Sequence, residues 1–286
     1  MAQVTGIEWT DHTANLVWGC TQVHAGCDNC YAKVLSNRWG YDVWGNSPRR
    51  VIGSFWNDLD KYQKQAKNNN RIARVFVGSM MDIFEKPMPM VDYHGNKLEG
   101  ATDDIRQRFF KNITDGMYPN LMFLMLTKRP SNINKYIPEV WKQTPPANVM
   151  FGTSPCDQAT AETLLPQLLQ VNGKRFLSLE PQLADVTLLK WLKTKQIHWV
   201  IQGGESGAGK RPFDTNWGRK IKAECATTGT PYFFKQVDKI QAIPLDLQVR
   251  QFPEDKLVRS AKTVVEVAAE IINIFCKKNL LSQLTI

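Results

Sequence analysis

The sequence predicts an α/β fold whose parallel strands close, fully or partly, into a barrel. Short apolar runs recur along the 286 residues, and most are followed by a stretch with a helical pattern. The runs are continuous rather than alternating, which is typical of parallel strands covered on both faces. No linker interrupts the alternation, so we expect one barrel, with a doubly wound open sheet as the alternative.

The expected strands follow from these runs in chain order. A first candidate, Asn15–Gly19, leads directly into a group of cysteines. The six further runs are Arg74–Met80, Leu121–Thr127, Asn148–Ser154, Arg175–Glu180, His198–Gly203 and Pro231–Gln236.

Helices are expected between the strands. Ile105–Met117 has an apolar face, and Asp157–Val171 begins with Asp157 as its N-cap. Asn216–Thr227 is followed by Gly229, a suitable C-cap.

The chain end predicts a separate helical element. Val264, Ala268, Ile271 and Phe275 fall near one face of a helix over Ser260–Phe275. We therefore expect residues 1–254 to form the barrel with its cysteine loop, and residues 255–286 to form a helical extension packed on it.

Composition limits the classes of function. No run approaches the roughly 18 apolar residues of a membrane helix, and the start lacks a secretory pattern, so we expect a cytoplasmic protein without membrane contact. The formal net charge of +9 favours an anionic partner such as a nucleic acid or a nucleotide. A basic surface that serves only solubility is the alternative.

Three of the six cysteines, Cys20, Cys27 and Cys30, form a C-x6-C-x2-C pattern. Clustered thiols in an intracellular protein indicate a metal site. On a four-iron cluster, three cysteines leave one iron open to a ligand such as S-adenosylmethionine; with His24 they would form a Cys3His zinc site. Unligated thiols are the third possibility. The position of the loop after the first candidate strand favours the cluster, and we expect the other cysteines to be core thiols.

Polar side chains follow almost every expected strand. In parallel α/β folds, the reactive residues gather at the carboxyl ends of the strands. We therefore expect a site built from residues that directly follow the apolar runs, among them Ser79, Asp82, Lys128, Arg129, Ser154, Glu180, Glu205 and Lys235. The basic members could meet an anionic substrate or pair with Asp82, Glu180 and Glu205.

A glycine-rich segment begins at Gly203. From Gly204 to Lys210 it matches the start of a phosphate-binding loop, but Arg211 stands where Ser or Thr should hold magnesium. Nucleotide hydrolysis is therefore disfavoured. We expect a glycine-lined strand end where the backbone approaches a ligand, with Glu205 as an acceptor; a flexible loop is the alternative.

Aromatic residues are dense near the start of the chain. Five of the nine tryptophans, from Trp9 to Trp56, lie in the first fifth. We expect them to pack around the cysteine loop, with base stacking as the alternative.

The ordered motifs resemble those of a known family, the phage-associated three-cysteine-motif proteins. These are related in sequence to radical S-adenosylmethionine enzymes such as spore photoproduct lyase. The resemblance spans roughly Ile7 to Glu254 and rests on Ile7-Glu8-Trp9-Thr10, Gly19-Cys20, Gly26-Cys27-Asp28-Asn29-Cys30-Tyr31-Ala32, Phe76-Val77-Gly78-Ser79-Met80-Met81-Asp82-Ile83-Phe84, Leu126-Thr127-Lys128-Arg129-Pro130, Leu179-Glu180-Pro181, Gly203-Gly204-Glu205-Ser206-Gly207 and Phe233-Phe234-Lys235-Gln236.

The resemblance implies a partial (β/α)6 TIM-like barrel, a 4Fe-4S cluster on Cys20, Cys27 and Cys30, and S-adenosylmethionine as cosubstrate. It also implies a partner protein encoded by a neighbouring gene. The radical enzymes space their cysteines C-x3-C-x2-C and carry Gly-Gly-Glu after the second strand, whereas here Gly-Gly-Glu comes much later. The expected cofactor contacts are Ser79, Asp82, Ser154, Glu180, Gly203, Gly204 and Glu205, and the expected substrate contacts are Lys128, Arg129 and Lys235.

Two functions remain open at the level of the sequence. The first is a radical S-adenosylmethionine enzyme that acts on a nucleic acid base or a nucleotide, in DNA modification or repair. The second is a nucleic-acid-binding protein without catalysis, stabilised by zinc or by a cluster.

Overall fold

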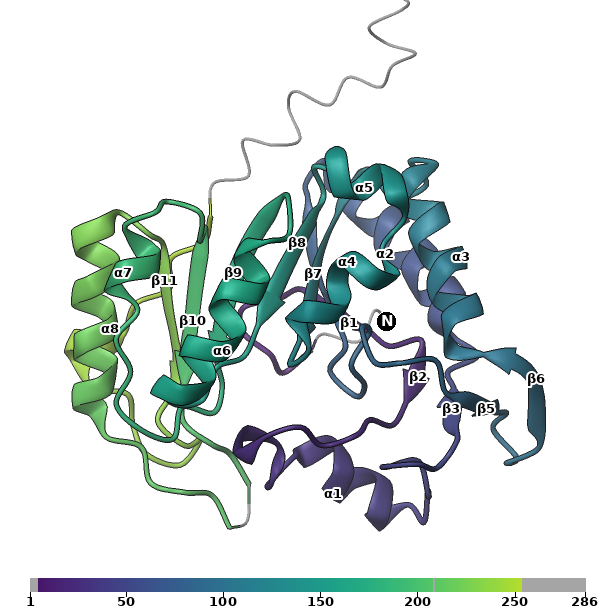
Figure 1. Cartoon of the computed structure of the whole chain (residues 1–286), viewed down its shortest axis with the longest axis horizontal. Helices are drawn as coiled ribbons and strands as arrows, with labels where there is room; N and C mark the ends of the chain where they lie inside the picture. The colour runs from purple at the N-terminus through teal and green to yellow at the C-terminus, as the bar shows by residue number, and fades with distance from the viewer. Residues whose placement is uncertain (1–4, 208, 254–286) are drawn as a thin grey trace, which may run out of the picture. The chain divides into compact units, whose positions relative to one another are not determined.

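A seven-stranded parallel sheet, curled into a half-barrel, is the frame of the protein in the computed structural model (Figure 1). The structure describes residues 5–207 and 209–253. The strand order is β1-β4-β7-β8-β9-β10-β11, so the chain adds each new strand of this sheet to the same edge. The bounds are β1 (His12–Ala14), β4 (Ala73–Val77), β7 (Leu121–Thr127), β8 (Val149–Thr153), β9 (Lys174–Leu179), β10 (Trp199–Gly203) and β11 (Tyr232–Gln236).

The middle strands are apolar because both of their faces are covered. All five residues of β8 are buried, and so are all five of β10. Phe123 of β7 packs edge-on against Phe109, with ring centroids 5.2 Å apart, and neither ring is exposed. The α/β class, the parallel sheet and its partial closure are therefore confirmed.

Helices lie at both ends of the strand order. In Figure 1, α8 (Thr215–Thr228) lies beside β10 and β11, and α2 (Phe55–Asn68) and α3 (Thr102–Thr114) lie at the opposite end. The remaining helices are α1 (Tyr31–Arg38), α4 (Ile133–Tyr136), α5 (Glu139–Gln143), α6 (Gln158–Leu169) and α7 (Leu189–Leu192), with 3-10 turns η1 (Ala25–Cys27), η2 (Pro130–Asn132) and η3 (Leu245–Leu247).

The expected helix caps are confirmed. The side chain of Asp157 accepts a hydrogen bond from the backbone N–H of Thr160 at the start of α6. Gly229 ends α8 in the left-handed conformation with a φ of 65°, which a residue with a Cβ rarely adopts.

A second, four-stranded sheet has the order β2-β3-β5-β6. Its strands are β2 (Val17–Trp18), β3 (Arg49–Val51), β5 (Pro89–Val91) and β6 (Lys97–Ala101). The sequence did not predict this sheet, because its strands are short and β6, at its edge, is largely exposed.

The expected first strand, Asn15–Gly19, needs a correction. Its middle forms β2, which belongs to the small sheet, and the parallel sheet opens instead with β1. β1 has only three residues and begins with His12, so it carries no apolar run. His12 is nevertheless buried, because its ring stacks on Tyr62 with centroids 3.9 Å apart.

The predicted C-terminal helix, Ser260–Phe275, and the rest of the extension over residues 255–286 lie outside the described residues, and so does Cys276. Among the helices that the structure describes, none is long and apolar enough to cross a membrane.

Candidate functional site

The three cysteines lie on one loop between β2 and α1. Gly19 introduces this loop with a φ of +123°, and a Cβ there would lie 2.1 Å from the carbonyl oxygen of Val43, so only glycine fits. Cys27 ends the turn η1, and Cys30 is the N-cap residue of α1. All three thiols are free and partly exposed.

This cysteine loop, Cys20–Cys30, is tied to the carboxyl ends of four strands of the parallel sheet. After β7, the guanidinium of Arg129 donates to the carbonyl oxygen of Thr21 and lies 3.8 Å from the sulfur of Cys20. After β8, the sulfur of Cys156 lies 3.6 Å from Nδ1 of His24.

The far end of the loop is fastened in the same way. After β10, Oε2 of Glu205 accepts a hydrogen bond of 2.8 Å from Nδ2 of Asn29. After β4, the carbonyl oxygen of Ser79 accepts one of 2.6 Å from the hydroxyl of Tyr31, the residue after Cys30. The cysteine loop therefore lies along the carboxyl-end rim of the parallel sheet.

Arg49 fastens the base of the loop from the small sheet. Its guanidinium is completely buried and forms a bidentate ion pair with Glu85, with N–O distances of 2.9 and 3.0 Å. It also donates to the hydroxyl of Thr21, next to Cys20, and to the backbone oxygens of Val43, Gly45 and Ser47. The sequence analysis did not single out Arg49 or Glu85. Glu85 lies three residues after Asp82, in the segment that follows a predicted strand, and this position was an available signal.

Asp82, Thr127 and Arg129 form one hydrogen-bonded group where β4 and β7 end. Oδ1 of Asp82 accepts from the hydroxyl of Thr127 at 2.7 Å, and Oδ2 pairs with Arg129 at 2.8 Å. Oδ2 also accepts from the backbone N–H of Lys128. Arg129 is therefore held by carboxylates, whereas the ammonium group of Lys128 forms no salt bridge within the described part of the chain.

Glu180 and Lys235 form the corresponding pair on the other half of the sheet. Nζ of Lys235 lies 2.9 Å from Oε1 of Glu180, and the indole N–H of Trp9 donates to Oε2 at 3.0 Å. Trp9 is itself buried against Phe76, with centroids 4.7 Å apart. Of the two roles open to Lys235, pairing with a rim carboxylate is the one that the structure has.

Glu205 is held by Arg211, the residue that replaced the magnesium ligand of a phosphate-binding loop. The guanidinium donates to both carboxylate oxygens, at 3.0 and 2.6 Å. Burial acts to raise the pKa of Glu205, but the hydrogen bonds from Arg211 and Asn29 outweigh it and the pKa falls below its usual range. Arg211 also donates to Asp28 and to the carbonyl of Ala25, so it joins the glycine-rich segment to the cysteine loop.

The two glycines before Glu205 are explained by close packing. A Cβ on Gly204 would lie 2.1 Å from the carbonyl oxygen of Val237, which excludes any larger residue. A Cβ on Gly203 would lie 3.4 Å from Oε1 of Glu180, so this glycine borders the Glu180–Lys235 pair.

The remaining expected contacts are two serines. Ser79 Oγ accepts a hydrogen bond of 2.8 Å from Nδ2 of Asn15, which the sequence had not singled out. The hydroxyl of Ser154 is buried and has no hydrogen-bond partner among the residues that the structure describes. An unpaired buried hydroxyl at a strand end is a free donor for a ligand.

The thiols are soft ligands whose chemistry suits iron or zinc, but they do not converge on one point. Within residues 5–207 and 209–253, no group of three or more His, Cys, Asp or Glu side chains is close enough to hold a metal ion. Burial and the carboxylates of Asp82 and Glu85 raise the pKa of Cys20 to about 12, against the opposing effect of Arg129. Without a metal, Cys20 is therefore a neutral thiol.

His24, the alternative fourth ligand, is neutral as well. Burial, followed by the charge of Lys128, lowers its pKa to about 4. Its Nδ1 accepts from the backbone N–H of Gly26, while its Nε2 is buried and has no partner within the described chain.

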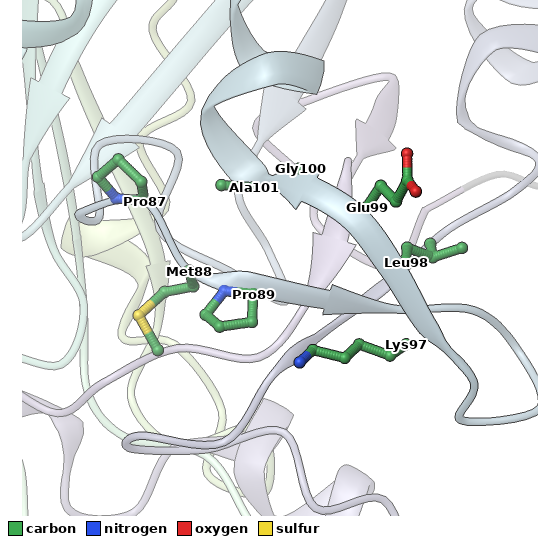
Figure 2. Close-up of a pocket in the computed structure, with 8 residues that line it drawn as sticks. All are labelled: Pro87, Met88, Pro89, Lys97, Leu98, Glu99, Gly100 and Ala101. Carbon is green, nitrogen blue, oxygen red and sulfur yellow. The ribbon is translucent and has the colours of Figure 1, made fainter.

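A hollow in the surface lies outside this rim. It has a volume of about 560 Å³ and is formed by the β5–β6 hairpin, where the side chains of Met88, Pro89 and Lys97 line it (Figure 2). None of the expected site residues lines this hollow.

The comparisons with known proteins add a family. The model of a family described as "Protein of unknown function (DUF5131)" matches residues 4–251. The chain belongs to the DUF5131 family. No curated protein and no solved structure matches it. The match covers every strand of both sheets and the cysteine loop of this DUF5131 protein.

Proposed function

We propose that this DUF5131 protein is an iron–sulfur enzyme of the radical S-adenosylmethionine type that acts on a nucleic acid base or a nucleotide. The observation that supports the proposal is the position of the cysteine loop. Three free thiols lie within eleven residues, and other residues of this segment contact the ends of β4, β7, β8 and β10. In parallel α/β barrels, this end of the sheet is where chemistry takes place.

The thiols of Cys20, Cys27 and Cys30 would hold the cluster and leave one iron for the amino acid end of the cosubstrate. When bound, the cluster would supply an electron, taken from a low-potential donor, for reductive cleavage of S-adenosylmethionine, while residues of the chain would orient the cosubstrate and the substrate. The three sulfurs do not converge on one point in the structure, so holding a cluster would require the loop to bring them closer together.

The rim residues have distinct parts in this proposal. Ser154 offers a buried hydroxyl without a partner, and Glu180 and Glu205 offer carboxylates that suit an ammonium group or ribose hydroxyls. Both carboxylates are already fixed by a cation, so they are oriented before a ligand arrives. The carbonyl oxygen of Ser79 holds Tyr31 at the end of the loop, and Asp82 holds Arg129 near Cys20. Gly203 borders Glu180.

The substrate class rests on charge. The chain carries a formal net charge of +9, and Lys128, half-buried at the rim, forms no salt bridge in the described chain. Arg129 and Lys235 act as positioning residues, because each is paired with a carboxylate. A phosphate of the substrate would meet Lys128 first.

Metal and sulfide analysis after purification without oxygen tests the proposal. We expect about four irons and four sulfides per chain, and formation of 5′-deoxyadenosine when S-adenosylmethionine and a reductant are added. Cys27→Ala should lose the iron and the brown absorbance. Cys225→Ala, which changes a buried thiol of α8, is the matched control and should keep both. Iron-free protein, or equal iron in the two variants, would contradict the proposal.

A second function is favoured by one observation on His24. A neutral imidazole with a buried, unpartnered Nε2 is a suitable fourth ligand for zinc, next to three cysteine sulfurs. The protein would then bind nucleic acid without catalysis. One zinc per colourless chain, lost in His24→Ala as well as in Cys27→Ala, would select this function.

A further inference from the structure

Next to the cysteine loop, two exposed aromatic rings, Trp39 and Tyr93, are joined by half-buried Tyr41 and Arg50; we call these four residues the aromatic platform. The ring centroids of Trp39 and Tyr41 lie 5.9 Å apart, and the guanidinium carbon of Arg50 lies 3.8 Å above the ring of Tyr41. The same carbon lies 5.8 Å from the ring of Tyr93.

These four residues come from three separate parts of the fold. Trp39 follows α1, Arg50 belongs to β3, and Tyr93 lies in the turn between β5 and β6. Trp18 of β2 supports the platform from below, since it is buried and its ring packs edge-on against Trp39 at 5.1 Å and Tyr41 at 5.4 Å. The rings are therefore fixed in place rather than loosely attached.

The platform is open to solvent to an unusual extent for such large rings. Trp39 is 56% exposed and Tyr93 is 71% exposed. On the adjoining helix α1, Tyr31 and Val34 are exposed as well. A contiguous exposed apolar surface marks an interaction site, whereas single exposed rings do not.

Two further cations lie on the adjoining helix α1. Lys33 and Arg38 of α1 are exposed, and within the described residues neither forms a salt bridge. The two carboxylates nearest in sequence are engaged in turns: Asp42 accepts from the hydroxyl of Ser47, and Asp92 accepts from backbone N–H groups of its own turn. The surface therefore combines aromatic rings with three cations, beside two carboxylates that are held in turns.

We propose that the aromatic platform binds single-stranded nucleic acid by stacking unpaired bases on Trp39 and Tyr93, while Arg50, Lys33 and Arg38 meet the phosphates. Base faces stack on aromatic rings whatever the sequence, and cations between the rings follow the backbone. Paired bases hide their faces inside the duplex, so the platform selects unpaired strands. This inference deepens the proposed function, on which it rests for the fate of the bound strand.

The location of the platform gives the bound strand a direction. Helix α1 begins after Cys30 and ends before Trp39, and at about 1.5 Å per residue the two residues lie about 13 Å apart along its axis. A strand stacked on Trp39 that follows α1 therefore brings a neighbouring nucleotide to the cysteine loop, where Tyr31 contacts the sheet rim.

Fluorescence anisotropy of the full chain with a labelled oligothymidine of about 15 nucleotides tests the inference, with the matching hairpin duplex as competitor. We expect Trp39→Ala to raise the Kd about 5- to 150-fold, and Trp39→Phe to stay close to the wild type. Leu245→Ala, which changes a side chain that is 87% exposed in η3, is the control and should leave the Kd unchanged.

Three outcomes would overturn the inference: no binding of the strand by the wild type, equal Kd values for the wild type and Trp39→Ala, or a wild-type dimer that Trp39→Ala converts to a monomer. Iron content and strand affinity, measured on the same proteins, separate the two proposals. Retained strand binding in wild-type protein that contains no iron supports the platform and refutes the enzyme. If Trp39→Ala leaves the Kd unchanged but still contains iron and forms 5′-deoxyadenosine, the platform is refuted and the proposed enzyme is not.

Discussion

Replacing Arg49 by methionine removes a charged group that the fold surrounds completely. The guanidinium is 0% exposed and Glu85 is 7% exposed at the side chain. The substitution leaves the carboxylate of Glu85 buried with only Arg129 as a more distant cation, at 3.7 Å. It also removes the Arg49 donor from three backbone carbonyl groups of the segment after the cysteine loop, and of these the carbonyl of Gly45 keeps the hydroxyl of Thr21.

The expected cost follows from this burial. Removing one partner of a buried ion pair destabilises a protein by about 3–5 kcal/mol, because the other charge stays buried without compensation. A domain of this kind has a total stability of about 5–15 kcal/mol, so the loss is a large fraction of it. The double variant Arg49→Met/Glu85→Leu removes both charges and should recover part of the loss.

Urea unfolding followed by circular dichroism measures these values by linear extrapolation. Arg219→Met is the matched control, because Arg219 forms an ion pair with Asp246 in which both side chains are nearly half exposed. We expect about 0–1 kcal/mol for this exposed pair. If Arg49→Met costs no more than Arg219→Met, or if the double variant is the least stable, the reasoning is wrong.

Three further predictions concern single positions. Gly19→Ala should lower the urea midpoint markedly, because the Cβ meets backbone at a positive φ, whereas Gly53→Ala, with open space around it, should not. Asp157→Ala should cost about 0.5–2 kcal/mol by loss of the α6 N-cap. Burial acts to raise the pKa of Asp11, but hydrogen bonds from a backbone N–H and from Arg71 lower it below its usual range. Asp11 therefore stabilises the fold above the unfolded pKa of about 4, and this stabilisation is lost as the pH falls through the folded pKa. The stability difference between wild type and Asp11→Asn should therefore shrink as the pH falls from about 6 through the unfolded pKa of about 4 and then through the lower folded pKa; a constant difference would contradict this.

The sequence predicted the strands best where both faces are buried. The run Leu121–Thr127 coincides with β7, because a strand in the middle of a parallel sheet carries apolar residues at every position. β1 was missed because it is short and begins with a histidine. Helix α2 was missed too, although Phe55, Leu59 and Ala66 bury one face of it at helical spacing.

The rule that reactive residues follow parallel strands placed most of the site. Asp82, Arg129, Glu180 and Glu205 were picked from strand ends, and all lie at the rim that the cysteine loop crosses. The rule works because parallel strands present their carboxyl ends at one edge of the sheet. It could not say which side chain meets which, since those meetings join distant parts of the chain.

By itself, therefore, the sequence determined the fold class, the order of the buried strands and the three thiols on one loop, because apolar runs, caps and cysteine spacing are local patterns. Only the tertiary structure decided the partners: Trp9 and Lys235 on Glu180, Asn29 on Glu205, and Arg49 on Glu85. Trp9 and Glu180 lie 171 residues apart in the chain. No local pattern encodes such a contact, because it arises only when the sheet curls and brings the strand ends and the loop together.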